Sequence, residues 1–189
     1  MGRSNDIVIP ADTPWLKDTR AQRVCRVLGD AGHQIYFVGG CVRNALLGLP
    51  DSDVDMSTDA TPTRVMALAS DAGIKAIPTG IDHGTVTLVV NGAPFEVTTF
   101  RRDVATDGRR AVVAFSTDIA DDAARRDFTM NALYADAAGR LIDPLDGIED
   151  LHAGRVRFIL NPDDRIKEDY LRTLRFFRFS AWSNAVHSI

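Results

Sequence analysis

The 189-residue sequence contains no apolar run long enough to cross a membrane, and its start lacks the basic end, apolar stretch and cleavage site of a secretory signal. It has only two cysteines, Cys25 and Cys41, and they do not form a C-x-x-C pair. Neither a disulfide framework nor a zinc site is therefore indicated. These absences predict a cytoplasmic location without membrane attachment, and no feature of the sequence indicates an obligate protein partner.

The chain also lacks an excess of positive charge: it has 22 Lys and Arg residues and 26 Asp and Glu residues, which give a net charge of -4. A nucleic-acid partner normally requires a basic surface. The distribution weakens that objection, since residues 151–189 carry 7 basic against 4 acidic side chains. Nearly all the basic residues are arginine, which suits bidentate contacts to phosphate, although a compositional habit of the source genome explains this preference equally well.

Hydrophobic spacing predicts an α+β fold, in which helices pack against a small mixed or antiparallel sheet and a helical segment follows. We predict strands at 34–38, 53–56, 84–90, 94–100 and 141–142, and helices at 18–32, 41–47, 62–72, 121–134 and from Asn161-Pro162 onward. Asp121 or Asp122 is the predicted cap of the fourth helix, and residues 101–110 are predicted to form a mobile loop. We place a domain boundary near Asp150, between a head at 1–150 and a helical segment at 151–189.

Two aspartates separated by one residue, Asp53 and Asp55, follow a glycine pair, Gly39-Gly40, along the chain. Side chains two apart on a strand share a face, and neighbouring carboxylates suit Mg²⁺. A glycine pair between a strand and a helix offers free backbone N–H groups to phosphate. Glu96, on another predicted strand, is a candidate third carboxylate for a second metal. Taken alone, the aspartates more often mark a solvated loop, and the glycines are also compatible with a simple tight turn.

Four motifs occur in order along the chain. They are GGCVRNALLG at 39–48 with DVD at 53–55, RRDFTMNA at 125–132, the set Asp143-Pro144, Gly147 and Asp150-Leu151, and EDYLR at 168–172. This order resembles the class II CCA-adding enzymes and bacterial poly(A) polymerases, within the nucleotidyltransferase superfamily that includes DNA polymerase beta. The sequence departs from the family at Asn44, where aspartate is common, and at Tyr170, where proline is common.

The resemblance implies a polymerase-beta-like nucleotidyltransferase head followed by the beginning of a helical neck. It implies that Asp53 and Asp55 are catalytic and bind Mg²⁺, with two ions during catalysis, and that the third motif couples head to neck. The residues implied to contact triphosphate or ribose are Gly39, Gly40, Arg43, Arg126, Asp127 and Asn131. Additional basic contacts are expected from Arg125, Arg175 and Arg178. The implied reaction adds C, C and A to the tRNA 3′ end from CTP and ATP without a nucleic-acid template.

The EDYLR motif is predicted to lie on one helix, where Asp169 and Arg172 share a face and Glu168 holds the Arg172 guanidinium. Asp169 only accepts hydrogen bonds and Arg172 only donates them. Cytosine and adenine each offer an amino donor beside a ring acceptor, which complements this pair, whereas uracil and guanine reverse the pattern. The motif thus predicts CTP and ATP over UTP and GTP. A solvent-exposed ladder of ion pairs is the alternative explanation of the motif by itself.

Two other functions remain open at this level. The first is a poly(A) polymerase, which shares all four motifs. The second is a protein that binds nucleotide or RNA with little turnover, because family members grip tRNA through body and tail domains that follow the neck. We expect the chain to be a head with only part of a neck. Residues 101–110 lie where the family has a flexible loop thought to assist the change from C to A addition.

Overall fold

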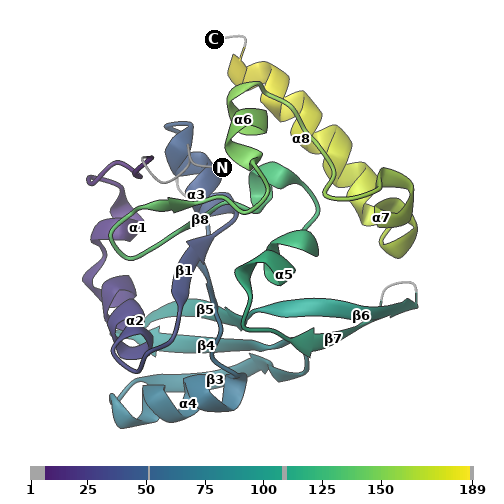
Figure 1. Ribbon diagram of the computed structural model, residues 1–189. Helices are drawn as coiled ribbons and strands as arrows, with labels where there is room; N and C mark the ends of the chain where they lie inside the picture. Colours follow the sequence, from purple (N-terminus) through teal and green to yellow (C-terminus); the bar gives the residue numbers. More distant parts are fainter. Residues whose placement is uncertain (1–6, 51, 108–109, 188–189) are drawn as a thin grey trace.

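A computed structural model describes residues 7–50, 52–107 and 110–187, and a seven-stranded sheet lies at its centre (Figure 1). The strand order is β3-β4-β5-β2-β1-β8-β9. The only parallel pair within this sheet is β2 with β5, and the other neighbours are antiparallel. The predicted α+β fold with a small mixed sheet is confirmed. The strands are β1 (Ile35–Val38), β2 (Asp55–Thr58), β3 (Lys75–Gly80), β4 (Thr85–Val90), β5 (Ala93–Thr99), β8 (Tyr134–Ala135) and β9 (Leu141–Ile142).

The N-terminal half supplies four helices: α1 (Pro14–Lys17), α2 (Thr19–Gly29), α3 (Gly40–Leu46) and α4 (Pro62–Asp71). In Figure 1, α2 and α4 lie at the lower left, beside the strands of the central sheet. The apolar spacing of α2 buries Val24 and Leu28 in the same core as Val86 and Leu88 of β4. The helices predicted at 18–32, 41–47 and 62–72 are confirmed, with ends that differ by up to three residues. Asp18 caps α2 by accepting a hydrogen bond from the Arg20 backbone at 2.8 Å.

The predicted strand at 53–56 is wrong in its bounds, because β2 begins only at Asp55. β1 ends at Val38, which pairs with Asp55, so the residues before Asp55 have no strand opposite them. Sequence spacing did not predict β3 or α6 (Gly147–His152). β3 contains Pro78, which is tolerated because this strand lies at the edge of the sheet. A short 3-10 turn, η2 (Ile81–His83), joins β3 to β4.

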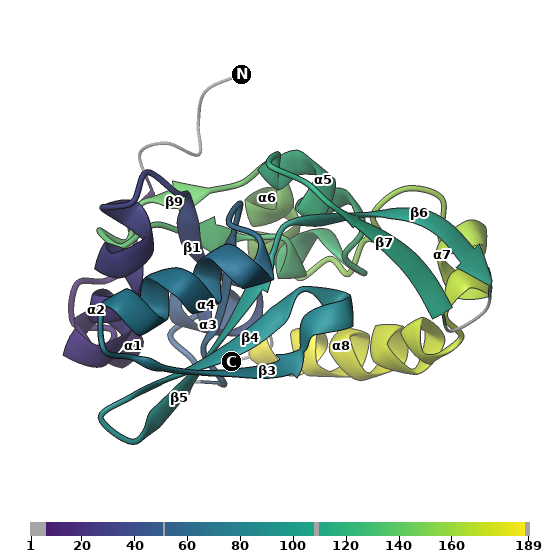
Figure 2. The ribbon, with the colours of Figure 1, turned by 90° about the horizontal axis from the view of Figure 1, so that it is seen from below.

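The loop predicted at 101–110 is a strand over most of its length, because β6 (Arg101–Asp107) and β7 (Arg110–Phe115) form an antiparallel hairpin. Residues 108–109 of that prediction lie outside the described residues. Pairing runs from Arg101 opposite Phe115 to Asp107 opposite Arg110, with a register shift between Asp103 and Ala105. The hairpin leaves the central sheet and extends to the end of the molecule where α7 lies, as both ribbon views show (Figures 1 and 2).

The helix predicted at 121–134 is much shorter in the structure, where α5 spans Ile119–Ala124. Asp118, rather than Asp121 or Asp122, is its N-cap. A 3-10 turn, η3 (Thr129–Asn131), then leads into β8. The continuation of the helix is lost because the Asp127 carboxylate accepts hydrogen bonds from the Phe128 backbone at 2.8 Å and from Asn131 Nδ2 at 3.0 Å. This turn directs the second motif towards the end of β1.

The C-terminal helix predicted from Asn161 onward begins as expected, since Asn161 Oδ1 accepts from the Asp163 backbone at 2.9 Å. It is nevertheless two helices, α7 (Pro162–Glu168) and α8 (Leu171–His187), because Asp169 is extended. Phe176 and Phe179 of α8 pack on Phe128 of the head, with ring centroids 6.3 and 5.8 Å apart. The helical segment therefore shares the core of the head, and the boundary near Asp150 stays a prediction.

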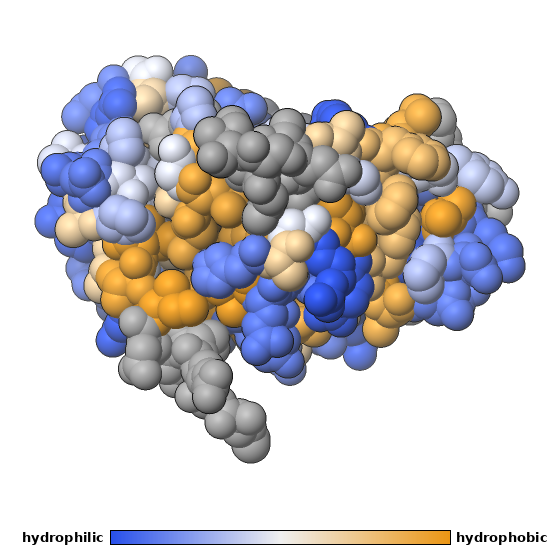
Figure 3. Space-filling view, turned by 90° about the horizontal axis from the view of Figure 1, so that it is seen from above, coloured by the Kyte–Doolittle hydropathy of each residue, from blue (hydrophilic) through white to orange (hydrophobic). Residues whose placement is uncertain are grey.

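The apolar stripe of the last helices faces outward, although such a stripe usually faces a core. Tyr170, Leu174 and Phe177 are 73%, 68% and 65% exposed. In Figure 3, apolar residues reach the surface among charged ones at the right-hand end, where α7 and α8 lie. Across the described ranges, no helix has both the length and the apolar character that crossing a membrane requires.

Candidate active site

A cavity of about 420 Å³ opens where β1 ends, between α3, the segment before β2, and α8. We call it the aspartate pocket. It brings together ten of the predicted site residues with two that were not predicted, Ser52 and Phe179. Its complete lining is Gly39, Gly40, Arg43, Ser52, Asp53, Asp55, Arg126, Asp127, Asn131, Arg175, Arg178 and Phe179.

The glycine pair makes room at the mouth of this pocket. Gly39 has φ 75, a left-handed conformation that glycine adopts without strain. A Cβ atom on Gly39 would lie 3.7 Å from Arg126 Nη1, and one on Gly40 would lie 2.9 Å from Ser52 Oγ. Glycine is therefore required for the turn, and its lack of a side chain leaves the pocket open beside an arginine and a hydroxyl.

Asp53 and Asp55 are both exposed to the aspartate pocket, although only Asp55 belongs to a strand. The argument that they share one strand face is thus wrong, and they meet because the segment before β2 turns into the pocket. Burial raises the pKa of Asp55, and the charges of Glu96 and Asp53 raise it further, with Arg126 opposing. In the part of the chain that the structure describes, no side chain donates a hydrogen bond to either carboxylate. Their negative charge therefore calls for a cation.

Glu96 lies on β5 directly opposite Asp55 in the parallel register. Among the residues described, however, no three His, Cys, Asp or Glu side chains converge as a metal site, so Glu96 does not complete a three-carboxylate cluster here. Mg²⁺ needs only one or two protein carboxylates, because it retains waters and takes substrate phosphate oxygens. The donor set of Asp53 and Asp55 fits Mg²⁺ on this chemistry, and Glu96 remains a candidate ligand.

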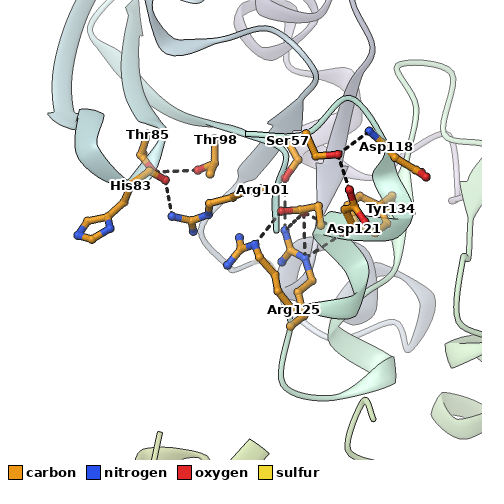
Figure 4. Close-up of polar contacts among 12 residues, drawn as sticks. Ser57, His83, Thr85, Thr98, Arg101, Asp118, Asp121, Arg125 and Tyr134 are labelled. Atoms are coloured by element: carbon orange, nitrogen blue, oxygen red, sulfur yellow. Dashed lines mark hydrogen bonds and ion pairs between the residues drawn. The ribbon is translucent and has the colours of Figure 1, made fainter. Parts of the chain in front are cut away.

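Arg126 is held behind the pocket by a buried network. Its Nη2 donates to Asp122 Oδ2 at 2.9 Å, and Tyr134 Oη donates to the same oxygen at 2.9 Å. Figure 4 shows Arg125, Ser57 and Tyr134, which surround this network. Burial by itself raises the pKa of Asp122, but the charges of Arg126 and Arg125 outweigh it and the pKa is lowered. Burial by itself would lower the pKa of Arg126. Its interactions with Tyr134 and Asp122 outweigh burial, so the pKa of Arg126 lies above its ordinary value. Arg126 is therefore fixed and charged.

Asp122 was missed as a site residue. The available signal was its spacing of three and four residues before Arg125 and Arg126, which is the spacing of ion pairs on a helix. Nothing in the sequence indicated that Asp122 is completely buried. Tyr134 and Ser57, which complete the network around Arg126, come from strands that are distant in the sequence. Phe179 was missed because an apolar residue next to an arginine does not by itself indicate a site.

A second cavity, of about 220 Å³, adjoins the first, and we call it the neck pocket. Three of its residues, Arg126, Asp127 and Arg175, also line the aspartate pocket. Its complete lining is Arg125, Arg126, Asp127, Asp169, Arg172 and Arg175. Residues of the second and fourth motifs therefore line the same cavity.

The EDYLR residues meet in a way that differs from the prediction. Glu168 Oε2 accepts from Arg172 Nη1 at 2.6 Å, as expected, and also from Arg165 Nη1. Asp169 and Arg172 do not share a face of one helix, because Asp169 lies in the junction and caps α8 through the Leu171 backbone at 3.0 Å. Both nonetheless line the neck pocket, so an acceptor and a donor stand in the same small cavity.

Arg165 ties this junction to the head. Only 3% of it is exposed, and its Nη2 donates to the backbone carbonyls of Arg125 and Arg126, at 2.8 Å in the second case. No local pattern distinguished Arg165 from the other charged residues of its helix. It holds Glu168 and the second motif in one arrangement.

The poly(A) polymerase head domain family matches residues 35–157. The chain is 46% identical over 148 residues to human mitochondrial CCA tRNA nucleotidyltransferase 1. The matched segment covers 78% of this chain and 34% of that protein. It is 45% identical over 170 residues to the CCA-adding enzyme of Oceanobacillus iheyensis. This match covers 89% of this chain and 41% of the relative. The chain therefore spans well under half the length of these relatives.

Solved structures of similar proteins have the same fold. The Bacillus stearothermophilus CCA-adding enzyme in complex with CTP superposes with a TM-score of 0.76 at 40% identity, over 85% of this chain and 38% of that one. A tRNA nucleotidyltransferase complexed with a primer tRNA and an incoming ATP analogue superposes with a TM-score of 0.67 at 31% identity, over 83% and 44%.

Proposed function

The chain belongs to the poly(A) polymerase head domain family, and from this premise we propose that it is the catalytic part of a CCA tRNA nucleotidyltransferase. It would add C, C and A to the tRNA 3′ end from CTP and ATP without a nucleic-acid template. The observation that carries the proposal is the junction of the two pockets, which share Arg126, Asp127 and Arg175. One pocket has carboxylates and arginines for a metal and a triphosphate, and the other has a donor and an acceptor for a base.

Asp53 and Asp55 would hold Mg²⁺, with Glu96 as a candidate further ligand and two ions during catalysis. The chemistry that the metal would supply is positive charge against the phosphate oxygens and activation of the primer 3′-hydroxyl. The raised pKa of Asp55 supports this assignment, because burial and the neighbouring acidic charges disfavour its ionised form, and a divalent cation reverses that penalty.

Arginine side chains around the aspartate pocket would position the triphosphate. Arg43, Arg126 and Arg178 line it from three different elements, so they can approach phosphate oxygens from several sides. Phosphoryl and nucleotidyl transfer depend mainly on such positioning and charge stabilisation. Gly39, Gly40 and Asn131 would contribute backbone and amide contacts, and Asp127 would contact triphosphate or ribose.

The base would enter the neck pocket. Glu168 holds Arg172 through Nη1, so the other guanidinium nitrogens of Arg172 would serve as donors to a base, and Asp169 would supply the acceptor. Arg125 and Arg175 add positive charge to the same cavity. A cytosine or adenine satisfies this donor and acceptor together, whereas a uracil or guanine leaves buried groups unpaired at about 1–3 kcal/mol each.

The test is to incubate the chain with Mg²⁺, each nucleoside triphosphate singly and in combination, and tRNA ending before, within or after CCA. Extension that stops after CCA supports the proposal. A long A tail would identify a poly(A) polymerase, the alternative function that shares all four motifs. Binding without extension would identify a nucleotide- or RNA-binding chain with little turnover. The cytoplasmic location expected from the sequence stays a prediction.

A further inference from the structure

Arg43 differs from most arginines of the two pockets in the partners that hold it. Arg125 and Arg126 pair with Asp122, and Arg175 pairs with Asp127. Among the residues that the structure describes, no carboxylate forms an ion pair with Arg43. Burial lowers the pKa of Arg43, and Asp127 only partly opposes this. Its orientation must therefore come from neutral groups.

Two amide side chains supply that orientation. Asn44 Oδ1 accepts from Arg43 Nη2 at 2.9 Å and from Nε at 3.2 Å, and Asn131 Oδ1 accepts from Nη1. Each amide is itself fixed through its Nδ2, because Asn44 donates to the Pro50 carbonyl at 2.9 Å and Asn131 donates to Asp127 at 3.0 Å. Every nitrogen of the Arg43 guanidinium is thus directed by an oxygen that carries no charge.

Two aromatic rings of α8 complete the enclosure. The Arg43 guanidinium carbon lies 5.0 Å from the centroid of Phe179 and 5.1 Å from that of Trp182. A ring attracts a guanidinium through its quadrupole and leaves the positive charge in place. The guanidinium is therefore restrained from several sides while its charge is still available to an anion in the aspartate pocket.

From this geometry we propose that Asn44 is a positioning residue that orients Arg43 for a substrate phosphate while leaving its charge unneutralised. The inference rests on the proposed function, since it assigns a role within the same triphosphate site. An aspartate at position 44 could accept from Arg43, but it could not donate to the Pro50 carbonyl, and it would compete with phosphate for the guanidinium. The family commonly has aspartate at this position, so the inference concerns this chain, in which the amide of Asn44 both accepts from Arg43 and donates to Pro50.

The test uses inorganic tripolyphosphate as the probe, with excess Mg²⁺, and measures its binding to the full 189-residue chain by calorimetry. Asn44→Asp should weaken binding roughly tenfold, because one charge-assisted contact is lost. Asn44→Ala should also weaken it, since the guanidinium loses its orientation, and it provides a second variant if the first is unstable. Asn91→Asp is the matched control: it adds the same charge at the exposed β4–β5 turn, where Asn91 has φ 49, and should bind like wild type.

The inference is overturned if Asn44→Asp binds tripolyphosphate as tightly as wild type, if Asn44→Ala does, or if the wild-type chain does not bind it. Nucleotide incorporation is measured in parallel to separate the two proposals. Unchanged tripolyphosphate binding by Asn44→Asp in a chain that extends tRNA refutes the role of Asn44 alone. Weakened binding in a chain that incorporates no nucleotide supports that role and refutes the proposed function.

Discussion

Arg175 of α8 forms an ion pair with Asp127 of the head, with 2.6 Å between Nη2 and Oδ2. Asp127 is nearly buried, and its other carboxylate oxygen fixes the turn that carries the second motif. Arg175 also lies 5.8 Å from the centroid of Phe179. This one pair therefore connects the C-terminal helix to the wall that the two pockets share.

Breaking this pair should affect stability and nucleotide binding together. Arg175→Ala is expected to lower the free energy of unfolding by about 1 kcal/mol, a modest effect because Arg175 is half exposed. It should also raise KM for CTP, because both pockets lose a positive charge. Urea unfolding of Arg175→Ala, Asp127→Asn and the double variant measures the coupling. Strictly additive losses would show that the pair contributes nothing.

Asp53→Ala should abolish nucleotide incorporation and leave the fold intact. Asp53 is exposed, and its side chain accepts no hydrogen bond from the described residues, so its loss leaves no buried group unpaired. Single-nucleotide extension of tRNA and far-UV circular dichroism provide the two measurements. Asp82→Ala, at an exposed aspartate of η2 outside both pockets, is the control and should retain incorporation. Retained polymerisation by Asp53→Ala would refute the metal assignment.

Asp55→Asn should raise the melting temperature at pH 7. A carboxyl whose pKa is raised on folding holds its proton more tightly in the folded state, so its ionised form destabilises the fold above that pKa. The advantage of the amide should shrink as the pH falls towards the unfolded value of about 3.9. The expected rise is about 1–3 °C, because Asp55 is solvent-accessible.

Thermal unfolding at pH 7 and pH 4, with and without MgCl₂, measures this effect. Mg²⁺ should stabilise the wild-type chain more than Asp55→Asn, since the variant lacks the carboxylate that benefits from the cation. A melting temperature for Asp55→Asn below that of wild type at pH 7 would contradict the electrostatic argument.

Asp169→Ala should change which nucleotides are incorporated. Without the acceptor, a base with a carbonyl at the same position is no longer rejected, so the preference for CTP and ATP over UTP and GTP should fall by roughly tenfold or more. The four-nucleotide incorporation profile measures this. Asp164→Ala, at an exposed aspartate in the first turn of α7, is the matched control and should keep the wild-type profile. An unchanged profile for Asp169→Ala removes the base-reading assignment.

Gly147→Ala should destabilise the head, because a Cβ atom there would collide with the Thr129 backbone carbonyl. The expected loss is about 1–3 kcal/mol or more, since backbone on both sides must shift. Gly29→Ala is the control, because a Cβ at the last residue of α2 meets nothing within 4 Å. Chemical denaturation of both variants measures the contrast, and equal stabilities would disprove the close approach of α6 to η3.

Local patterns in the sequence correctly predicted several elements. The glycine pair after β1 and the start of α7 at Asn161 each depend on backbone conformations or hydrogen bonds made within a few residues. The candidate site residues were likewise proposed from short motifs, through residue types and spacings that suit a metal, a triphosphate or a base and through the resemblance of those motifs to a known family.

Long-range contacts decided what local patterns predicted wrongly. β2 starts at Asp55 because β1 ends opposite it, and the helix at α5 stops because Asp127 binds the chain that follows. The junction at Asp169 separates two helices whose apolar spacing is continuous in the sequence.

The sequence by itself therefore determined which side chains are candidates for the chemistry, because residue types, short spacings and the order of the motifs can be seen without the fold. Only the tertiary structure decided that Asp53 stands outside the strand, that Asn44 and Trp182 enclose Arg43, and that the two pockets share a wall. The contact that defines this wall joins Arg175 to Asp127, 48 residues apart. Such a pairing depends on how the elements pack, and no local pattern encodes it.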